Sequence, residues 1–324
     1  MQHELSGVVV VDKPANITSA KVVAIVKKLF RAKKAGHTGT LDPFATGVMV
    51  CCINRATRLS NFFLHGNKKY QAVLHLGAST DTQDSTGTIT STCNKIDRSE
   101  EEIQEAFKKF NGTFEQLPPV YSALKHKGVP LYKLARSGTP VQKPARNVHI
   151  SYINILEIDL PLIRFEVACS AGTYIRTLCA DIGTLLGCGG HLKELRRIEN
   201  SGFTIEEAAT LSELEELAHS DKLSCRTISM ANALRDMPEH FADNVLAEKI
   251  VHGNILTQQD VRYNVLTNLL LNVHVTSHLH IQVFVHRGVG FDHQLVPRRP
   301  SSRSQCSLIE RQYLQRVCTN APKG

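Results

Sequence analysis

Apolar residues near the start of the chain form one continuous run and then a spaced pattern. The run from Gly7 to Val11 predicts a buried strand. From Val22 to Phe30 the apolar positions fall mostly three and four residues apart, and Thr18 or Ser19 stands where a helix N-cap is expected. The pattern therefore predicts a strand followed by an amphipathic helix, with a basic segment from Arg31 to Lys34 after it.

Two later segments, Tyr70 to Leu76 and Ile163 to Ala168, alternate between apolar and polar residues. A period of two residues predicts strands with one buried face. Ser99 and Glu102 are spaced as a capping box, which predicts a helix from about residue 100. Strands followed by helices in separate runs indicate a mixed fold of the α+β class.

Composition limits the kind of protein. With 324 residues the chain has room for one large domain and a small one. It contains no apolar run long enough to span a bilayer and no signal-peptide core, so we expect a cytoplasmic protein. The 9 cysteines include no Cys-x-x-Cys pair, which favours scattered thiols in a reducing compartment over disulfides or a zinc site.

Charge is distributed unevenly around Asp42. The chain has a net charge of +8, and Asp42 is the only carboxylate between Asp12 and Asp81, in a stretch rich in lysine and arginine. A basic field suits a polyanion such as RNA. Nearby positive charge is expected to lower the pKa of Asp42 and keep it ionised, as a carboxylate nucleophile requires. The alternative is an ordinary Gly/Thr-rich surface turn.

The residues around Asp42 also form a recognisable motif. Gly36 to Pro43, with Ala45 to Gly47 after it, resembles the signature of the TruB family of tRNA pseudouridine synthases. Six further segments match the family in order, so the resemblance covers about residues 5 to 235: Gly7–Pro14, Lys69–Tyr70, Gly77–Thr82, Pro119–Lys125, Gly172–Arg176 and Leu195–Arg197.

This resemblance implies a fold and a reaction. Residues 1–235 are expected to form a catalytic domain around a largely antiparallel sheet, acting as a monomer on the T-arm stem-loop of tRNA. The implied reaction converts uridine at position 55 to pseudouridine, with the target base flipped out of its stack. No atoms are gained or lost, so no redox or group-transfer cofactor is required. The resemblance also implies no metal and no protein partner.

The resemblance also assigns roles to individual residues. Asp42 is the nucleophile or base, and the family pattern leaves open whether it attacks C1′ or acts through a glycal route. Arg176 pairs with Asp42, and a two-pronged guanidinium suits that task better than lysine does. Tyr70 stacks on the base and handles protons. His37 fills or stacks on the space that the flipped base leaves, and Tyr174 and Leu195 line the base pocket.

The segment from residue 117 to residue 146, called here the thumb segment, is free of acidic residues. Gly and Pro interrupt it, which predicts loop and short helix. It resembles the family's thumb loop, which closes over the RNA, and Lys125, Lys127 and Lys133 are expected to bind the RNA backbone. The alternative is a solvated basic loop.

The chain changes character near Pro238. Residues 238–324 are expected to form a small C-terminal segment, and Val245 to Leu256 resembles the start of an RNA-binding PUA domain. After about residue 260 no match remains, so a divergent or poorly ordered tail is expected. The histidines in this tail (His274, His278, His280 and His286) are spaced too irregularly to predict a metal site.

Two other functions fit parts of the sequence. One is a guide-dependent relative that modifies ribosomal RNA, although the thumb segment is typical of stand-alone bacterial enzymes. The other is a non-catalytic RNA-binding or RNA-folding protein. The combination of Asp42, Tyr70 and Arg176 argues against this second function, because binding alone needs no carboxylate beside phosphates.

Overall fold

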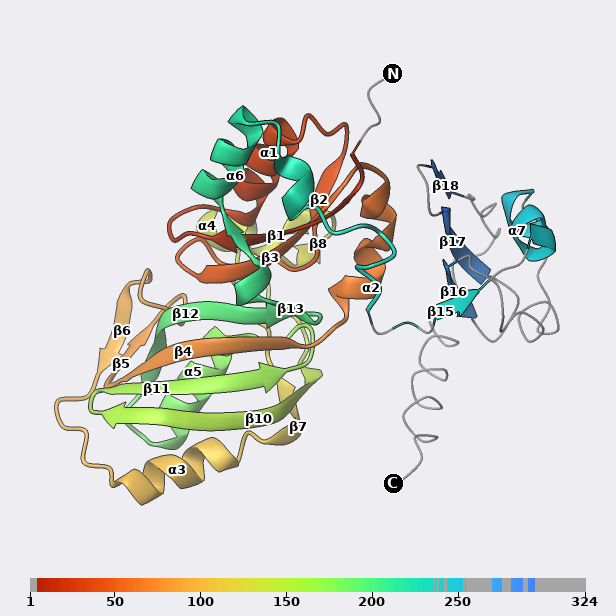
Figure 1. The fold of residues 1–324 in the computed structure, drawn as a ribbon. Coiled ribbons are helices and arrows are strands. Elements are labelled where there is room, and N and C mark those ends of the chain that lie inside the picture. Colours follow the sequence, from red (N-terminus) through yellow and green to blue (C-terminus); the bar gives the residue numbers. More distant parts are fainter. Residues whose placement is uncertain are drawn as a thin grey trace, which may run out of the picture. The chain divides into compact units, whose positions relative to one another are not determined.

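In the computed structural model, the chain divides into two units, Met1–Ile228 and Ser229–Gly324 (Figure 1). The structure describes residues 5–235, 237, 239–241, 244–252, 254, 270–275, 281–287 and 291–294. None of the helices within these ranges has the length and apolar character needed to cross a bilayer. The two units are described separately below.

The first unit is built on a 10-stranded sheet in which most neighbouring strands run antiparallel, as the sequence predicted. The strands on its main path, in spatial order, are β14 (Ala209–Thr210), β1 (Gly7–Lys13), β3 (Thr46–Ile53), β12 (Gly190–Asn200), β4 (Lys68–Leu76), β11 (Leu162–Cys169), β10 (Arg146–Asp159) and β7 (Gly112–Gln116). Short strands β2 (Ala35–His37) and β13 (Phe203–Thr204) pair with β3 and β12. The two parallel pairings are β1 with β14 and β3 with β12.

Helices pack on this sheet in two groups, and each group covers its own apolar core. The helices are α1 (Ser19–Leu29), α2 (Ser60–Leu64), α3 (Glu100–Lys108), α4 (Leu131–Arg136), α5 (Ile175–Leu185) and α6 (Leu211–His219). Helices α1 and α6 bury apolar residues against β1 and β3, while α3 and α5 bury theirs against β4, β10 and β11. Three short 3-10 helices, η1 (Asn54–Leu59), η2 (Ile205–Glu207) and η3 (Leu223–Arg226), complete the unit.

The predicted caps explain where two of these helices begin. Thr18 is the N-cap of α1, and its hydroxyl accepts a hydrogen bond from the Lys21 N–H. Ser99 and Glu102 form the predicted capping box at the start of α3. Both caps satisfy backbone N–H groups that the first helical turn leaves unpaired, so the local sequence specifies these boundaries.

Strand β12 lies between β3 and β4 and brings together residues that are far apart in the sequence. Arg197 lies opposite Gly47 of β3 on one side and opposite Tyr70 of β4 on the other. Gly47 has a φ of +103°, and a Cβ at this position would collide with the Arg197 carbonyl oxygen. The close approach therefore requires glycine, and it places the Asp42 loop (residues 36–49) beside β12, the strand that also pairs with β4 at Tyr70.

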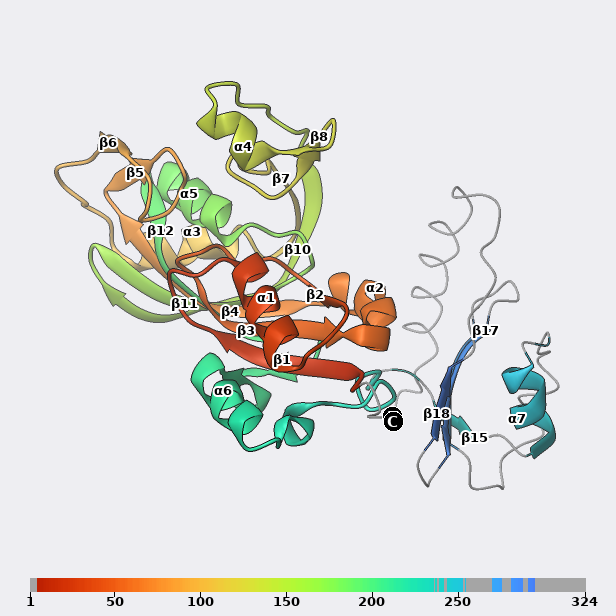
Figure 2. The same cartoon turned by 90° about the horizontal axis from the view of Figure 1, so that it is seen from above.

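The thumb segment is a small lobe at the rim of the sheet (Figure 2). It contains the two-residue strands β8 (Lys125–His126) and β9 (Val129–Pro130), followed by α4. Leu131 is its one fully buried large apolar side chain, and most of its other residues are exposed or half-buried. The predicted mixture of loop and short helix is confirmed.

Two further short strands, β5 (Ala78–Thr80) and β6 (Ile89–Thr92), pair with each other as a hairpin. The second unit contains α7 (Asn244–Val251) and a four-stranded antiparallel sheet. Its strands are β15 (Glu239–Phe241), β16 (Leu270–Val275), β17 (Ile281–Arg287) and β18 (Phe291–Gln294). The side chains of the tail histidines, and most of the tail after residue 260, lie outside what the structure describes.

Candidate active site

The backbone on either side of Asp42 is fixed by buried side chains. The Ser19 hydroxyl donates to the Leu41 carbonyl and accepts from the Leu41 N–H, both at 2.9 Å. On the other side of Asp42, the fully buried Lys13 donates from Nζ to the Pro43 carbonyl at 3.0 Å. Asp42 thus lies between two anchored neighbours, which limits the positions open to its carboxylate.

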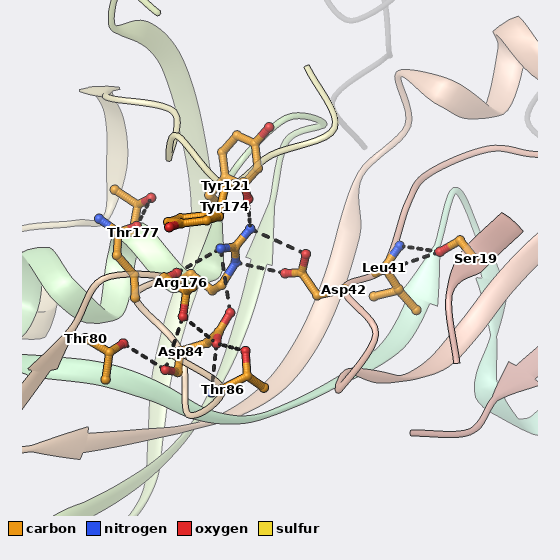
Figure 3. Close-up of polar contacts among 12 residues, drawn as sticks. Ser19, Leu41, Asp42, Thr80, Asp84, Thr86, Tyr121, Tyr174, Arg176 and Thr177 are labelled. Carbon is orange, nitrogen blue, oxygen red and sulfur yellow. Dashed lines mark hydrogen bonds and ion pairs between the residues drawn. The ribbon is translucent and has the colours of Figure 1, made fainter. Parts of the chain in front are cut away.

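Arg176 holds the Asp42 carboxylate from one side (Figure 3). Its Nε lies 2.9 Å from Oδ2 of Asp42, close enough for an ion pair although not aligned as a hydrogen bond. Its Nη2 donates to Oδ1 of Asp42 at 3.4 Å and to the Tyr121 carbonyl at 2.8 Å. Arg176 is only 3% exposed, whereas the Asp42 side chain is 33% exposed, so the guanidinium is buried and the carboxylate partly faces solvent. The structure thus brings together the pair that the resemblance implied.

A second carboxylate, Asp84, lies on the same guanidinium. Its Oδ2 is 3.6 Å from Nη1 of Arg176, which also donates to the Thr82 carbonyl at 2.8 Å. Oδ1 of Asp84 accepts hydrogen bonds from the hydroxyls of Thr82 and Thr86. Asp84 therefore caps the turn formed by residues 82–86 and also contacts Arg176, so a second carboxylate lies close to Asp42.

Burial raises the pKa of Asp42 above its ordinary value. Arg176 opposes this shift and Asp84 adds to it. The sequence prediction of a lowered pKa is therefore wrong, because it counted the lysines and arginines of the neighbouring sequence but neither the burial nor Asp84. Since one guanidinium serves two carboxylates, it compensates each of them only in part.

Tyr70 is 8% exposed and belongs to the same apolar cluster as Leu41 and Ala45 of the Asp42 loop. Its hydroxyl forms a hydrogen bond with Arg197, a buried residue that also donates to the carbonyls of Val48 and Gly39. Burial raises the pKa of the Tyr70 hydroxyl, so this group is neutral at pH 7 and can donate a proton. Arg197 thus ties Tyr70 to both ends of the loop.

His37 is half-buried on β2, where its Nδ1 accepts a hydrogen bond from the Gly39 N–H at 3.3 Å. Nδ1 therefore carries no proton, and burial with the charge of Arg197 lowers the pKa of His37. The ring is a neutral imidazole at pH 7, which suits contact with bases better than contact with phosphate charge.

Tyr174 and Leu195 lie on two different elements near this site. The Tyr174 backbone bonds to the Gln116 side chain in both directions, at 2.8 and 3.0 Å, and the Arg146 guanidinium lies 5.0 Å from its ring centre. Figure 3 shows the Tyr174 ring beside the Arg176 guanidinium. Leu195 is half-buried on β12 opposite Ala72, and it packs against the same core as Tyr70.

The thumb lysines have a different environment. Lys125, Lys127 and Lys133 are exposed, and none of them forms an ion pair within the described part of the chain. The thumb segment reaches the site at its beginning, where the Tyr121 carbonyl accepts from Arg176. The structure does not place these three lysines with Asp42, and it links His37 to Gly39 of the same loop and not to Asp42 itself.

Three residues of the site were not singled out from the sequence: Lys13, Asp84 and Arg197. Each is less than 5% exposed. Burial of a charged side chain is rare unless the group is paired, so the structure marks these three residues, although the sequence does not show their burial. Their sequence motifs (Asp12-Lys13-Pro14, the threonines around Asp84 and Leu195-Arg196-Arg197) were the available signals. Among the described residues, no group of three or more His, Cys, Asp or Glu side chains is arranged to hold a metal ion.

Comparison with family models places this site in a known class. Residues 27–175 match the model of the TruB family pseudouridylate synthase N-terminal domain, and residues 176–237 match that of the tRNA pseudouridylate synthase B C-terminal domain. The first match includes Asp42, Tyr70 and Asp84, and the second begins at Arg176.

Relatives with similar sequences carry the same designation. The tRNA pseudouridine synthase B of Syntrophotalea carbinolica is 45% identical over 234 residues, which are 72% of this chain and 76% of the relative. That of Alkaliphilus oremlandii is 42% identical over 250 residues, 77% of this chain and 82% of the relative.

Solved structures of similar fold include a Cbf5-Nop10-Gar1 complex, with 31% identity and a TM-score of 0.61 over 77% of this chain and 68% of that one. A second is an H/ACA RNP bound to a substrate RNA containing 2′-deoxyuridine, with 29% identity and a TM-score of 0.59 over 77% of this chain and 67% of that one. With both family models and relatives of 42–45% identity in agreement, the chain belongs to the TruB family of pseudouridylate synthases.

Proposed function

We propose that this chain converts uridine to pseudouridine at position 55 in the T-arm of tRNA, with Asp42 as the catalytic carboxylate. The observation that carries the proposal is the anchored Asp42 carboxylate, held by two nitrogens of the buried Arg176. Relatives named tRNA pseudouridine synthase B support tRNA as the substrate class. We further propose that the chain acts as a monomer in the cytoplasm, without a protein partner.

The reaction rearranges one nucleoside without adding or removing atoms. The N1–C1′ bond breaks, the uracil turns, and a new bond joins C5 to C1′; C5 then loses its proton, and N1 gains one. Asp42 serves either as the nucleophile at C1′ or as the base of a glycal route. Both routes need an ionised carboxylate in a fixed place: Arg176 favours the ionised form of Asp42, and the anchored Leu41 and Pro43 fix its backbone.

Arg176 positions Asp42, and Asp84 positions Arg176. A planar guanidinium that contacts both carboxylate oxygens restricts rotation of Asp42, which a single ammonium group would not do. Asp84 and the carbonyls of Thr82 and Tyr121 occupy the remaining donors of Arg176. The guanidinium is thus held in one orientation before any substrate arrives.

The flipped uracil is proposed to stack on Tyr70, with Tyr174 and Leu195 as further walls of the base pocket. The neutral Tyr70 hydroxyl, next to Arg197, is the group proposed to move a proton during rearrangement. His37 is proposed to fill or stack on the space that the base leaves in the RNA. Extrusion of the base costs a few kcal/mol, and these contacts offset that cost.

The thumb segment is proposed to bind the RNA backbone. Lys125, Lys127 and Lys133 present exposed ammonium groups with no described carboxylate beside them. Phosphate contacts of this kind add affinity and position the RNA, while leaving the chemistry to Asp42.

The deciding experiment is pseudouridine mapping on an unmodified tRNA transcript incubated with the purified chain alone. The expected result is pseudouridine at position 55 and no other added component required. The structural similarity to proteins in Cbf5 and H/ACA complexes keeps a guide-dependent activity on ribosomal RNA as a second candidate. No modification without added guide RNA would favour that candidate, and binding without modification under either condition would favour a non-catalytic RNA-binding protein.

A further inference from the structure

A basic pocket opens beside β2, where the Asp42 loop begins. Its volume is about 430 Å³. The residues that line it come from the end of α1, the following loop, β2, β3, η1 and α2: Lys27, Lys33, Lys34, Ala35, Gly36, His37, Cys52, Thr57 and Ser60. We call it the lysine pocket. It has three lysines in its wall and no carboxylate.

The pocket wall is built on a rigid support. Asn54 has a φ of +51°, and its Oδ1 accepts from the backbone N–H groups of Lys33 and Lys34 at 2.8 and 3.3 Å. The Asn54 N–H donates to the Lys34 carbonyl at 2.8 Å. This one residue therefore fixes the loop that carries two of the three lysines, and the lysine backbone is already in place before a ligand binds.

The polar groups in the wall favour an anion with strong acceptors. Lys27 and Lys34 form no ion pair with any carboxylate in the described part of the chain. The hydroxyls of Thr57 and Ser60 already donate to backbone carbonyls at 2.8 and 2.9 Å. The ammonium groups of Lys27 and Lys34 are thus the available donors, and donors of this type match the oxygens of a phosphate.

The position of the pocket relates it to the proposed reaction. His37 lines the pocket and also bonds through Nδ1 to Gly39, at the start of the segment that leads to Asp42. A nucleotide flipped toward Asp42 remains joined to its neighbours through phosphates on both sides. A strand that left the site past His37 would therefore reach the lysine pocket.

We propose that the lysine pocket binds one backbone phosphate of the RNA strand next to the flipped nucleotide. This proposal rests on the proposed function. It assigns to Lys27 and Lys34 a contact that holds the strand while the base is out of its stack. The thumb lysines, in a separate lobe, would contact other phosphates.

The test uses a series of T-arm stem-loops, each carrying one uncharged methylphosphonate at a different position near the target uridine. In the unaltered protein, the substitution at the pocket phosphate should weaken binding about tenfold, the effect of removing one charge-assisted hydrogen bond. In the Lys27→Ala/Lys34→Ala variant, the same substitution should have almost no further effect. Lys28→Ala is the control, because Lys28 is exposed on the same helix and does not line the pocket.

Three outcomes decide the matter. The proposal is supported if a methylphosphonate at one position weakens binding to the unaltered protein and to the control but not to the pocket variant. The proposal is overturned if, at every position, the methylphosphonate weakens binding equally in the pocket variant, the control and the unaltered protein. If the unaltered protein forms pseudouridine and no position near the uridine couples to the pocket, the lysine pocket proposal fails while the proposed function stands. Circular dichroism spectra of the variants exclude misfolding as the cause of a general loss.

Discussion

The Asp42 loop and the thumb segment are both interrupted by glycine and proline, but the loop is anchored by buried side chains and the thumb segment is mostly exposed. In the Asp42 loop, Leu41, Ala45 and Thr38 are buried, and Ser19 and Lys13 anchor the backbone. In the thumb segment the lysines are exposed and only short elements support them. Chemistry requires groups fixed in advance, whereas contact with a flexible polyanion does not. The difference predicts that changes in the loop lower the rate and changes in the thumb lower the affinity.

The largest effect is expected at Asp42. Asp42→Asn keeps the shape but removes the carboxylate, so single-turnover pseudouridine formation should fall about 10⁴-fold, as for other residues that act directly in the chemistry. Binding of tRNA should stay near its original strength, because the change removes a negative charge beside an anion. The control is Asp81→Asn, an exposed aspartate in the nearby turn. Activity within about tenfold of the unaltered protein would show that Asp42 is not the catalytic group.

The next effect concerns Tyr70, which supports the loop and faces the site. Tyr70→Phe keeps the ring and removes the hydroxyl, so turnover should fall about 100-fold while tRNA binding changes little. Single-turnover kinetics and filter binding on the same RNA separate these quantities. Tyr152→Phe is the control, because it removes a hydroxyl that bonds to Glu166 elsewhere on the sheet. Unchanged turnover in Tyr70→Phe would leave ring stacking as the only role of this residue.

A smaller loss is expected when Arg176 becomes lysine. One ammonium cannot reproduce the contact with both Asp42 oxygens, so the activation free energy should rise by about 1–3 kcal/mol. Rapid-quench measurement at saturating enzyme reports this step. Arg226→Lys, at a half-exposed pair with Glu213, is the matched control. If Arg176→Lys and the control behave alike, the two-point contact does not matter for the chemistry.

Changes in the thumb segment are expected to lower the affinity for tRNA. Replacing Lys125, Lys127 and Lys133 together by alanine should lower the slope of log affinity against log salt by about 0.7–0.9 for each phosphate that the variant no longer binds. Saturating enzyme should restore most of the single-turnover rate. The control removes three exposed lysines elsewhere: Lys95, Lys108 and Lys222. An unchanged slope would mean that the thumb lysines face solvent in the complex, and a rate that saturation cannot restore would mean that the thumb helps assemble the site.

The smallest expected effect is a shift in pH dependence. Asp84 raises the pKa of Asp42, so Asp84→Asn should lower that pKa and keep Asp42 ionised to lower pH. The acid limb of the single-turnover pH profile should therefore move to lower pH, even though the rate at the plateau falls as Arg176 loses a partner. A limb that moves to higher pH would contradict this electrostatic account.

Several features of the fold were readable from local sequence. Thr18 and Ser99 predicted the starts of α1 and α3, and alternation predicted β4 and β11, because caps and period-two patterns act over a few residues. The pairing of Asp42 with Arg176, in contrast, came from resemblance alone. The two residues are 134 positions apart, and no local pattern connects them.

The sequence did not show which charged side chains of the site are buried. Asp84 caps a turn, and nothing in the local sequence indicated that this turn packs against Arg176. Burial also reversed the predicted direction of the Asp42 pKa shift, because positive charge along the sequence can be counted while distance from water cannot. Lys13 and Arg197 were visible only as part of motifs, and their roles follow from the carbonyls that they reach in the folded chain.

The place of β12 between β3 and β4 has a consequence for how the protein is made. The Asp42 loop is synthesised early, but Gly47 rests against Arg197, and Arg196 contacts Thr46 across 150 residues of sequence. A nascent chain in which β12 has not yet been synthesised lacks the strand that packs against the loop and joins it to β4. Closing so long a connection is a slow step that local helix formation does not require. An unfinished chain that lacks β12 therefore carries the Asp42 motif without the strand that joins this loop to β4.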